Sequence, residues 1–315
     1  MLAISKMYFM CFSLFLARTL RFHTVVGAGT RSSTSQTTIF KQKNLTLLMS
    51  ISRLGVRQSH REAKINMTTD TEIMDVSQDW VTACDVQQRF MQHPDATIDA
   101  LRYSARCRQV CALGGDCYDV LPLSHNRVAL AVGDASGKSL AAALMISSVQ
   151  SSLRTAVSFA GNDAGAVVRA VNSQVHASSL ADRYATLFYG VFDGTTRTLR
   201  YVNAGHNPPI VIRQDRSMIR LQTGGVPVGI FPNWSYEEGV VQLRPGDLIM
   251  AYTDGVTEAV NPAGEEWGIE GLRKAVDKSA AQCPDDIACA IFTSMDEFSR
   301  GCQRDDATVI VAEVN

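Results

Sequence analysis

The sequence carries little net charge, and it lacks the cysteine pairs that would place it in several common classes of protein. The formal net charge of −1 gives no support for nucleic acid as the main partner. None of the eight cysteines stands in a Cys-x-x-Cys pair, which argues against a zinc ribbon. With 46% hydrophobic residues the chain can form a sizeable core. We therefore expect a soluble, cytoplasmic protein with reduced, buried thiols.

The first 61 residues contain no Asp or Glu but nine Lys and Arg residues. Their apolar stretch, Met7–Ala17, is shorter than the roughly 20 residues that span a bilayer. Three interpretations stay open: a signal or targeting peptide, a membrane anchor, or sequence upstream of the natural start, since Met67 opens a polar stretch that contains acids. We expect residues 1–66 to be a disordered or non-native extension.

Hydrophobic periodicity predicts the elements after residue 66. Ser77–Gln92 has apolar residues near helical spacing and is stopped by His93-Pro94, so residues 67–96 are expected to be an amphipathic linker with a possible switching role. Asp193-Gly194 predicts a hairpin. Pro209–Arg213 and Ser217–Leu221 are expected to form a second hairpin, and two further strands, Tyr236–Leu243 and Asp247–Tyr252, are expected on either side of Pro245-Gly246.

Two pairs of helices are expected among these strands. One pair comes before most of the strands, with Asp163 as an N-cap, and the other precedes the last strand. The pattern predicts an α/β (α+β) sandwich over residues 97–315, in which two antiparallel β-sheets are flanked by helices in αββα layers. The predicted helices are Leu140–Phe159, 164–178, Glu270–Ala281 and Pro284–Phe298.

Four aspartates in small, turn-rich settings are the main candidates for chemistry. Three of them adjoin apolar strands, and glycines beside them let backbone and ions approach closely. Carboxylates gathered at strand ends suit hard cations such as Mg2+ or Mn2+, and without a cation they would raise one another's pKa. These four candidates are Asp116, Asp134, Asp254 and Asp305.

Three of these aspartates also have an ordinary structural explanation. Asp134 could be a helix N-cap, Asp254-Gly255 is a common turn dipeptide, and Asp305-Asp306 could be a solvated turn. Four such sites in one domain favour the interpretation as a two-metal hydrolase.

The order of six motifs adds a resemblance to a known family. GGDCYD, GDASGK, NAGHNPP, GGVPVGI, PGDLIMAYTDGVTEA and DDATVIV follow one another between Ile98 and Val314. In this order they resemble the PPM-type metal-dependent serine/threonine protein phosphatases, and most closely the bacterial RsbU/SpoIIE-like branch.

The resemblance implies roles for individual residues. Asp134 would bridge two Mn2+ or Mg2+ ions, and the carbonyl of Ala135 would complete one coordination sphere. Asp254 and Asp305 would hold the other side, and Asp116 would act directly or through a bound water. It further implies that a hydroxide activated by the metals attacks phosphorus, with Asp134, Asp254 and Asp116 as the catalytic residues.

Four further residues are weaker candidates. Asp119 and Asp306 are expected to support the ligands, Lys138 could bind phosphate, and His206 could donate a proton. Ser136 stands where eukaryotic-type relatives carry a histidine, so the general acid is unassigned.

The resemblance also implies a substrate and a mode of regulation. The expected substrate is a phosphorylated protein, namely an anti-sigma-factor antagonist of a bacterial partner-switching pathway in stress signalling. Ser77–Gln92 would contact an activator or a second copy of the chain.

Two alternatives come from other functional classes. A phosphatase fold serving as a catalytically silent regulatory scaffold would have lost metal-ligand aspartates, and none of the four is lost here. Gly133–Ser139 resembles a P-loop, but only three residues separate Gly133 from Gly137, where that motif has four.

Overall fold

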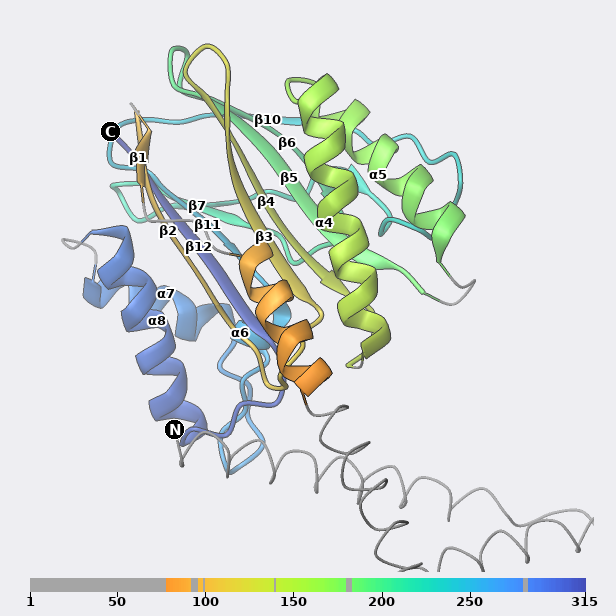
Figure 1. The fold of residues 1–315 in the computed structure, drawn as a ribbon. Helices are drawn as coiled ribbons and strands as arrows, with labels where there is room; N and C mark the ends of the chain where they lie inside the picture. Colours follow the sequence, from red (N-terminus) through yellow and green to blue (C-terminus); the bar gives the residue numbers. More distant parts are fainter. Residues whose placement is uncertain (1–77, 92–95, 99, 139, 180–182, 280–282) are drawn as a thin grey trace, which may run out of the picture. The chain divides into compact units, whose positions relative to one another are not determined.

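The computed structural model describes residues 78–91, 96–98, 100–138, 140–179, 183–279 and 283–315 (Figure 1). The apolar stretch Met7–Ala17 and the rest of the predicted extension lie outside the described residues. Within the described part, no helix is both long and apolar enough to cross a bilayer. The chain divides into two units at residues 80 and 81, and the fold given below is that of the second unit.

Two six-stranded sheets form the centre of this unit, and nearly all their strands are antiparallel. In sheet A the order is β1 (Ala96–Ile98), β2 (Leu101–Arg108), β12 (Ala307–Val314), β11 (Leu248–Tyr252), β7 (Ile210–Ile212) and β8 (Met218–Arg220). In sheet B it is β10 (Gly239–Gln242), β6 (Thr198–Ala204), β5 (Ala185–Asp193), β4 (Arg127–Ala135) and β3 (Asp116–Leu123), with β9 (Gly224–Gly225) parallel to β6.

Helices cover the outer face of each sheet (Figure 1). The alternation along β5 shows how sheet B is buried on both faces: Leu187 and Tyr189 pack in the core under the helices, whereas Phe188 and Phe192 pack in the core between the sheets. This order of layers confirms the predicted αββα sandwich. Sheet B is covered by α4 (Leu140–Ala160) and α5 (Ala164–Ser178), and sheet A by α7 (Gly268–Ser279) and α8 (Pro284–Ser299).

Most of the predicted local structure is confirmed. The hairpin of β5 and β6 turns at Asp193, whose carboxylate accepts hydrogen bonds from the N–H groups of Thr195 and Thr196 at 2.9 and 3.0 Å. Asp163 caps α5 by accepting from Ala166 N–H at 2.7 Å. The predicted amphipathic helix is helical over residues 78–90.

The cysteines were predicted correctly only in part. The seven that lie in the described residues are all free thiols, as expected. Four of them are exposed, however, so the expectation of burial was wrong for Cys111, Cys283, Cys289 and Cys302.

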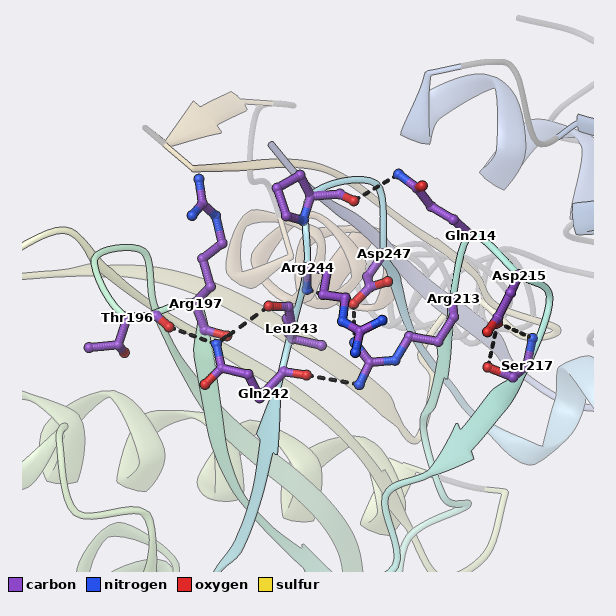
Figure 2. Close-up of polar contacts among 11 residues, drawn as sticks. Thr196, Arg197, Arg213, Gln214, Asp215, Ser217, Gln242, Leu243, Arg244 and Asp247 are labelled. Atoms are coloured by element: carbon purple, nitrogen blue, oxygen red, sulfur yellow. Dashed lines mark hydrogen bonds and ion pairs between the residues drawn. The ribbon is translucent and has the colours of Figure 1, made fainter.

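The strands predicted on either side of Pro245-Gly246 are present, but they do not pair with each other. β10 joins sheet B through β6, and β11 joins sheet A through β7 and β12, so the chain crosses between sheets at this turn. Figure 2 shows the polar contacts of this crossing. Arg213 donates to the Gln242 carbonyl at 2.8 Å and pairs with the buried carboxylate of Asp247, which also accepts from Arg244 N–H at 2.7 Å. These contacts hold the crossing segment against sheet A.

We predict that Asp247→Ala strongly destabilises the protein. The substitution leaves the largely buried guanidinium of Arg213 without its counter-ion, and breaking such a pair costs about 3–5 kcal/mol. The free energy of unfolding from urea titration measures the effect. The control is Glu270→Ala, which removes a solvent-exposed pair with Arg273 and should change stability by less than about 1 kcal/mol. Equal losses in the two variants would contradict this account.

Candidate metal centre

Asp116 and Asp134 lie directly opposite each other where β3 and β4 pair. The apolar run that precedes Asp134 buries β4 between α4 and sheet A, which fixes the register of the pair. Beyond Asp134, the N–H of Ala135 donates to the Gly115 carbonyl at 2.9 Å. The two predicted carboxylates from separate motifs are therefore neighbours across one ladder.

Asp116 connects the two sheets. It is 2% exposed, and its Oδ2 accepts hydrogen bonds from the hydroxyls of Thr253 at 2.8 Å and Thr308 at 2.7 Å, both of which come from sheet A or its edge. Burial raises the pKa of Asp116 to about 7; the two hydroxyls lower it, and Asp306 and Asp254 raise it further. Sheet A thus supplies neutral donors rather than a counter-ion.

Asp254 begins the short helix α6 (Asp254–Thr257), which the sequence did not predict. Gly255 explains how this turn reaches Asp305 and Asp306: a Cβ at Gly255 would overlap the carbonyl oxygen of Asp306, so only glycine allows the approach. Burial raises the pKa of Asp254, and the charge of Asp305 raises it further.

The strongest sign of a common cluster is the electrostatic environment of Asp134. Its pKa is raised to about 8, first by burial and then by the charges of other aspartates. These neighbours are Asp116, Asp254, Asp305 and Asp306. The structure thus brings together the four aspartates selected from sequence and adds Asp306 to them.

The aspartate oxygens and the Ala135 carbonyl are chemically suited to a divalent cation, although the carboxylates are not arranged around a single point. Within the described residues, no group of three or more His, Cys, Asp or Glu side chains is arranged to hold a metal ion as it stands. The ligand chemistry nevertheless fits Mn2+ or Mg2+, because the available donors are aspartate oxygens with the backbone carbonyl of Ala135 beside them. The raised pKa values of Asp116 and Asp134 show that a positive charge at this place would be stabilising.

Lys138 supplies one positive charge to the cluster. Its ammonium group forms an ion pair with Asp305 and donates to the carbonyl of Arg304 at 3.1 Å. Lys138 thus partly neutralises the side of the cluster formed by Asp305.

Asp306 fastens the loop that leads into β3. Its two carboxylate oxygens accept from the N–H groups of Val110 and Gly115, both at 2.7 Å. Because Gly115 precedes Asp116, this interaction positions the start of β3 and hence the Asp116 side chain.

Asp119 lies away from the cluster. It is 1% exposed and forms an ion pair with Arg154 of α4 at 2.7 Å, on the opposite face of β3 from Asp116. This contact ties β3 to α4, and it gives Asp119 no direct access to the other aspartates.

His206 is buried beside the cluster and does not touch its carboxylates. Its Nδ1 lies 2.8 Å from Thr186 Oγ1, which lies 3.4 Å from the carbonyl oxygen of Asp134. Burial lowers the pKa of His206 to about 4, and the backbone of Tyr252 offsets only part of this effect. The imidazole is therefore neutral at physiological pH.

The structure disfavours the P-loop alternative. Gly133 and Asp134 are part of β4 and pair with Cys117 and Asp116, so these backbone groups belong to a ladder rather than to a loop around phosphate. Lys138, the residue that would reach a nucleotide, contacts Asp305 instead.

Sequence reasoning missed three residues that position the cluster. Thr253 and Thr308 bond to Asp116, and Gln87 of helix 78–90 bonds to Gly114. Thr253 directly precedes Asp254, and Thr308 follows Asp305 closely. This closeness to candidate aspartates was a weak indication that the threonines belong to the site. Their partner is 137 and 192 residues away, respectively, so sequence alone could not pair them.

Comparison with known families identifies the family of this chain. The profile of the family described as stage II sporulation protein E (SpoIIE) matches residues 124–315, more than half of the chain. The chain belongs to the SpoIIE family. This confirms the resemblance to the RsbU/SpoIIE-like branch, and the matched segment includes Asp134, Asp254 and Asp305.

Curated relatives of this SpoIIE-family chain share about a quarter of its residues. Protein IcfG of Synechocystis is 27% identical in an alignment 220 residues long that covers 61% of this chain and 34% of IcfG. RsbU of Bacillus subtilis is 25% identical over 230 residues, covering 73% of this chain and 68% of RsbU. The chain thus spans about a third of the length of IcfG and about two thirds of RsbU.

Solved structures show the same fold. The RsbU and RsbW domains of Rv1364c from Mycobacterium tuberculosis match with a TM-score of 0.60 at 26% identity, covering 71% of this chain and 64% of that one. The SiaA-PP2C domain of Pseudomonas aeruginosa matches with a TM-score of 0.67 at 20% identity, covering 78% and 99%. The sandwich of this SpoIIE-family member is therefore the PP2C fold.

We predict that Asp134→Asn stabilises the protein in the presence of a chelator, and more so at pH 8 than at pH 5. The folded state keeps a proton on Asp134 up to about pH 8, whereas the unfolded carboxyl releases it near pH 4. Between these values the folded state binds more protons, so this carboxyl destabilises it increasingly as pH rises. The asparagine variant should melt several degrees higher at pH 8, at about 2–4 °C for each kcal/mol.

Thermal unfolding of both proteins in chelator measures this difference. Asp215→Asn, in an exposed turn, is the control and should show no such gain at pH 8. Added Mn2+ should raise the melting temperature of the wild type more than that of Asp134→Asn. An equal melting temperature of wild type and variant at both pH values would refute the electrostatic coupling.

Proposed function

We propose that the protein is a Mn2+- or Mg2+-dependent phosphatase that removes phosphate from serine or threonine residues of a protein substrate. The observation that carries this proposal is the gathering of four aspartates at one end of the sandwich. The pKa values of Asp116, Asp134 and Asp254 are raised, and the charge of Asp305 contributes to the rise at Asp134 and Asp254. Such a cluster favours divalent cations, and the fold is that of PP2C phosphatases.

The names of the relatives and of the structural neighbours support this proposal. RsbU and RsbP of Bacillus subtilis are named phosphoserine phosphatases, and they share 25% and 22% of aligned residues with this chain. Structures with the same fold include PstP in complex with two manganese ions and RsbX in complex with magnesium. We infer that this chain also uses two ions.

The residues of this chain would divide the work as follows. Asp134, Asp116, Asp254 and Asp305 would hold the ions together with the carbonyl of Ala135. When bound, the ions would lower the pKa of a water and neutralise charge on the phosphoryl group. Asp306 would keep the Gly115 loop and Asp116 in place through its two backbone hydrogen bonds.

The serine or threonine oxygen that leaves needs a proton, and the structure narrows the choice of donor. His206 is neutral and buried behind Thr186, so we do not assign the proton to it. A solvent molecule at the open side of the cluster is the donor that we favour, since Lys138 and Asp305 there are partly exposed.

We further propose that the substrate is a phosphorylated anti-sigma-factor antagonist. Two comparisons support a role in partner switching. One solved neighbour contains RsbU and RsbW domains in a single protein, and another comes from a study of the bacterial stressosome. A purified phosphorylated antagonist offered to the protein tests this finer proposal.

Helix 78–90 is the proposed site of regulation by an activator or a second copy. Gln87 on its inner face is 6% exposed; its amide donates to the Gly114 carbonyl at 2.8 Å and accepts from Gly114 N–H at 3.0 Å. Gly114 precedes Gly115, which is bonded to Asp306. A shift of the helix would therefore reach the loop that carries Asp116.

We predict metal-dependent turnover of p-nitrophenyl phosphate. Activity should require Mn2+, disappear on chelation and fall by about 100-fold or more in Asp134→Asn, because a central ligand is lost. Asp215→Asn is the matched control and should keep full activity. Activity that survives both chelation and Asp134→Asn would contradict the metal mechanism. A folded protein that binds Mn2+ without any turnover, towards this compound or phosphopeptides, would support the scaffold alternative.

We predict that Gln87→Ala lowers metal-dependent turnover by about tenfold, because the buried groups of Gly114 lose two partners at a cost of about 1–3 kcal/mol. The neighbouring Gln88 is exposed on the same helix, so Gln88→Ala is a control of identical chemistry and should have no effect. Turnover and Mn2+ affinity should be measured for both variants. Equal behaviour of the two variants would show that the Gln87 contact does not position the site.

A further inference from the structure

We propose that Arg183 binds the phosphate group of the substrate. This assignment rests on the proposed phosphatase function and names a residue that the motif analysis did not select. Arg183 lies just before β5, outside the aspartate motifs, and the fold brings it to the loop that follows Asp134.

Three hydrogen bonds hold Arg183 and Tyr184 against this loop. A guanidinium nitrogen of Arg183 donates to the Ser136 carbonyl at 3.0 Å. Ser136 N–H donates to the Tyr184 carbonyl at 2.9 Å, and Tyr184 N–H donates to Ser136 Oγ at 3.2 Å. The side chain and the backbone at Arg183 are therefore both fixed two or three residues from Asp134.

Gly137 provides the space for the guanidinium. A Cβ at this position would stand 2.7 Å from Nη1 of Arg183, and Gly137 has a φ of +96°, which disfavours other residues independently. The glycine of the GDASGK motif thus lets Arg183 lie directly over the loop. This second observation places the guanidinium against Gly137, three residues after Asp134.

Arg183 differs from Lys138 and Arg154 in that no described carboxylate neutralises its charge. Lys138 is paired with Asp305, and Arg154 is paired with Asp119. Among the described residues, the guanidinium of Arg183 has no carboxylate within ion-pair distance, and it donates instead to the neutral carbonyl of Ser136. The hydrogen bond to Ser136 uses one of the five N–H donors of the guanidinium.

A phosphate monoester needs such a group here. The substrate carries nearly two negative charges and must approach a cluster of aspartates, so the bound ions alone would have to overcome the repulsion. A planar guanidinium offers paired donors that match phosphate oxygens, and hydrogen bonds between charged groups are stronger than neutral ones. Because Arg183 is already fixed on the loop, little side-chain entropy is lost when phosphate binds.

The test uses the full-length protein and two probes, a phosphoserine peptide and inorganic phosphate. Arg183→Gln should raise the KM for the peptide and the inhibition constant for inorganic phosphate by about tenfold or more, with Mn2+ affinity unchanged. Arg183→Lys should recover part of the loss, because it restores charge without paired donors. Arg169→Gln, an exposed arginine on α5, is the matched control and should leave both constants unchanged.

Two results would overturn the proposal. One is an unchanged inhibition constant for inorganic phosphate in Arg183→Gln. The other is a parallel loss of Mn2+ affinity or of thermal stability, which would mean that Arg183 only supports the loop. If the wild type has no turnover, the proposed function fails instead. Calorimetric binding of inorganic phosphate to the Mn2+-loaded wild type and to Arg183→Gln then still decides the role of Arg183.

Discussion

The carboxylate of Asp116, buried between two sheets, is the constraint on which the rest of the site depends. It starts β3 in sheet B and accepts hydrogen bonds from Thr253 and Thr308 on the side of sheet A. Sheet A therefore cannot slide relative to sheet B at this end without leaving buried hydroxyls and a buried carboxylate unpaired. The same contact brings Asp254 and Asp305, which directly follow or closely precede these threonines, to Asp134.

This arrangement has an electrostatic cost that a bound cation would remove. Asp134 has its pKa raised to about 8 by burial and by four neighbouring aspartates, and Lys138 neutralises only the side of Asp305. Repulsion among buried carboxylates is commonly retained where it serves a function. In this member of the SpoIIE family, the binding of divalent ions explains the repulsion best. Gly255 lets the turn at Asp254 approach Asp306 closely, and the two hydrogen bonds of Asp306 hold the loop before Asp116 in place despite the repulsion.

Sequence patterns predicted local and repetitive features well. They failed where contacts between residues far apart in the sequence determine the structure. Alternation and turn dipeptides gave the strands, and Asp193-Gly194 gave a true hairpin. Pro245-Gly246 has the same appearance but joins two sheets. Arg213, which is distant from this turn in the sequence, contacts Gln242 before it and Asp247 after it and so fixes the crossing. In the site, the aspartates were found because each motif is local. The threonines, Gln87 and Arg183 were missed because their roles arise only from folding.

The most direct test of the account is a crystal structure of the Mn2+-loaded protein with anomalous diffraction data collected at the manganese absorption edge. We expect two manganese peaks at the aspartate cluster, both within about 2.0–2.2 Å of Asp134 oxygens, with the Ala135 carbonyl bound to one of them and Lys138 no longer paired with Asp305. A structure from saturating Mn2+ that shows no peak at the cluster, with Lys138 still bound to Asp305, would contradict the claim that these aspartates form a metal centre.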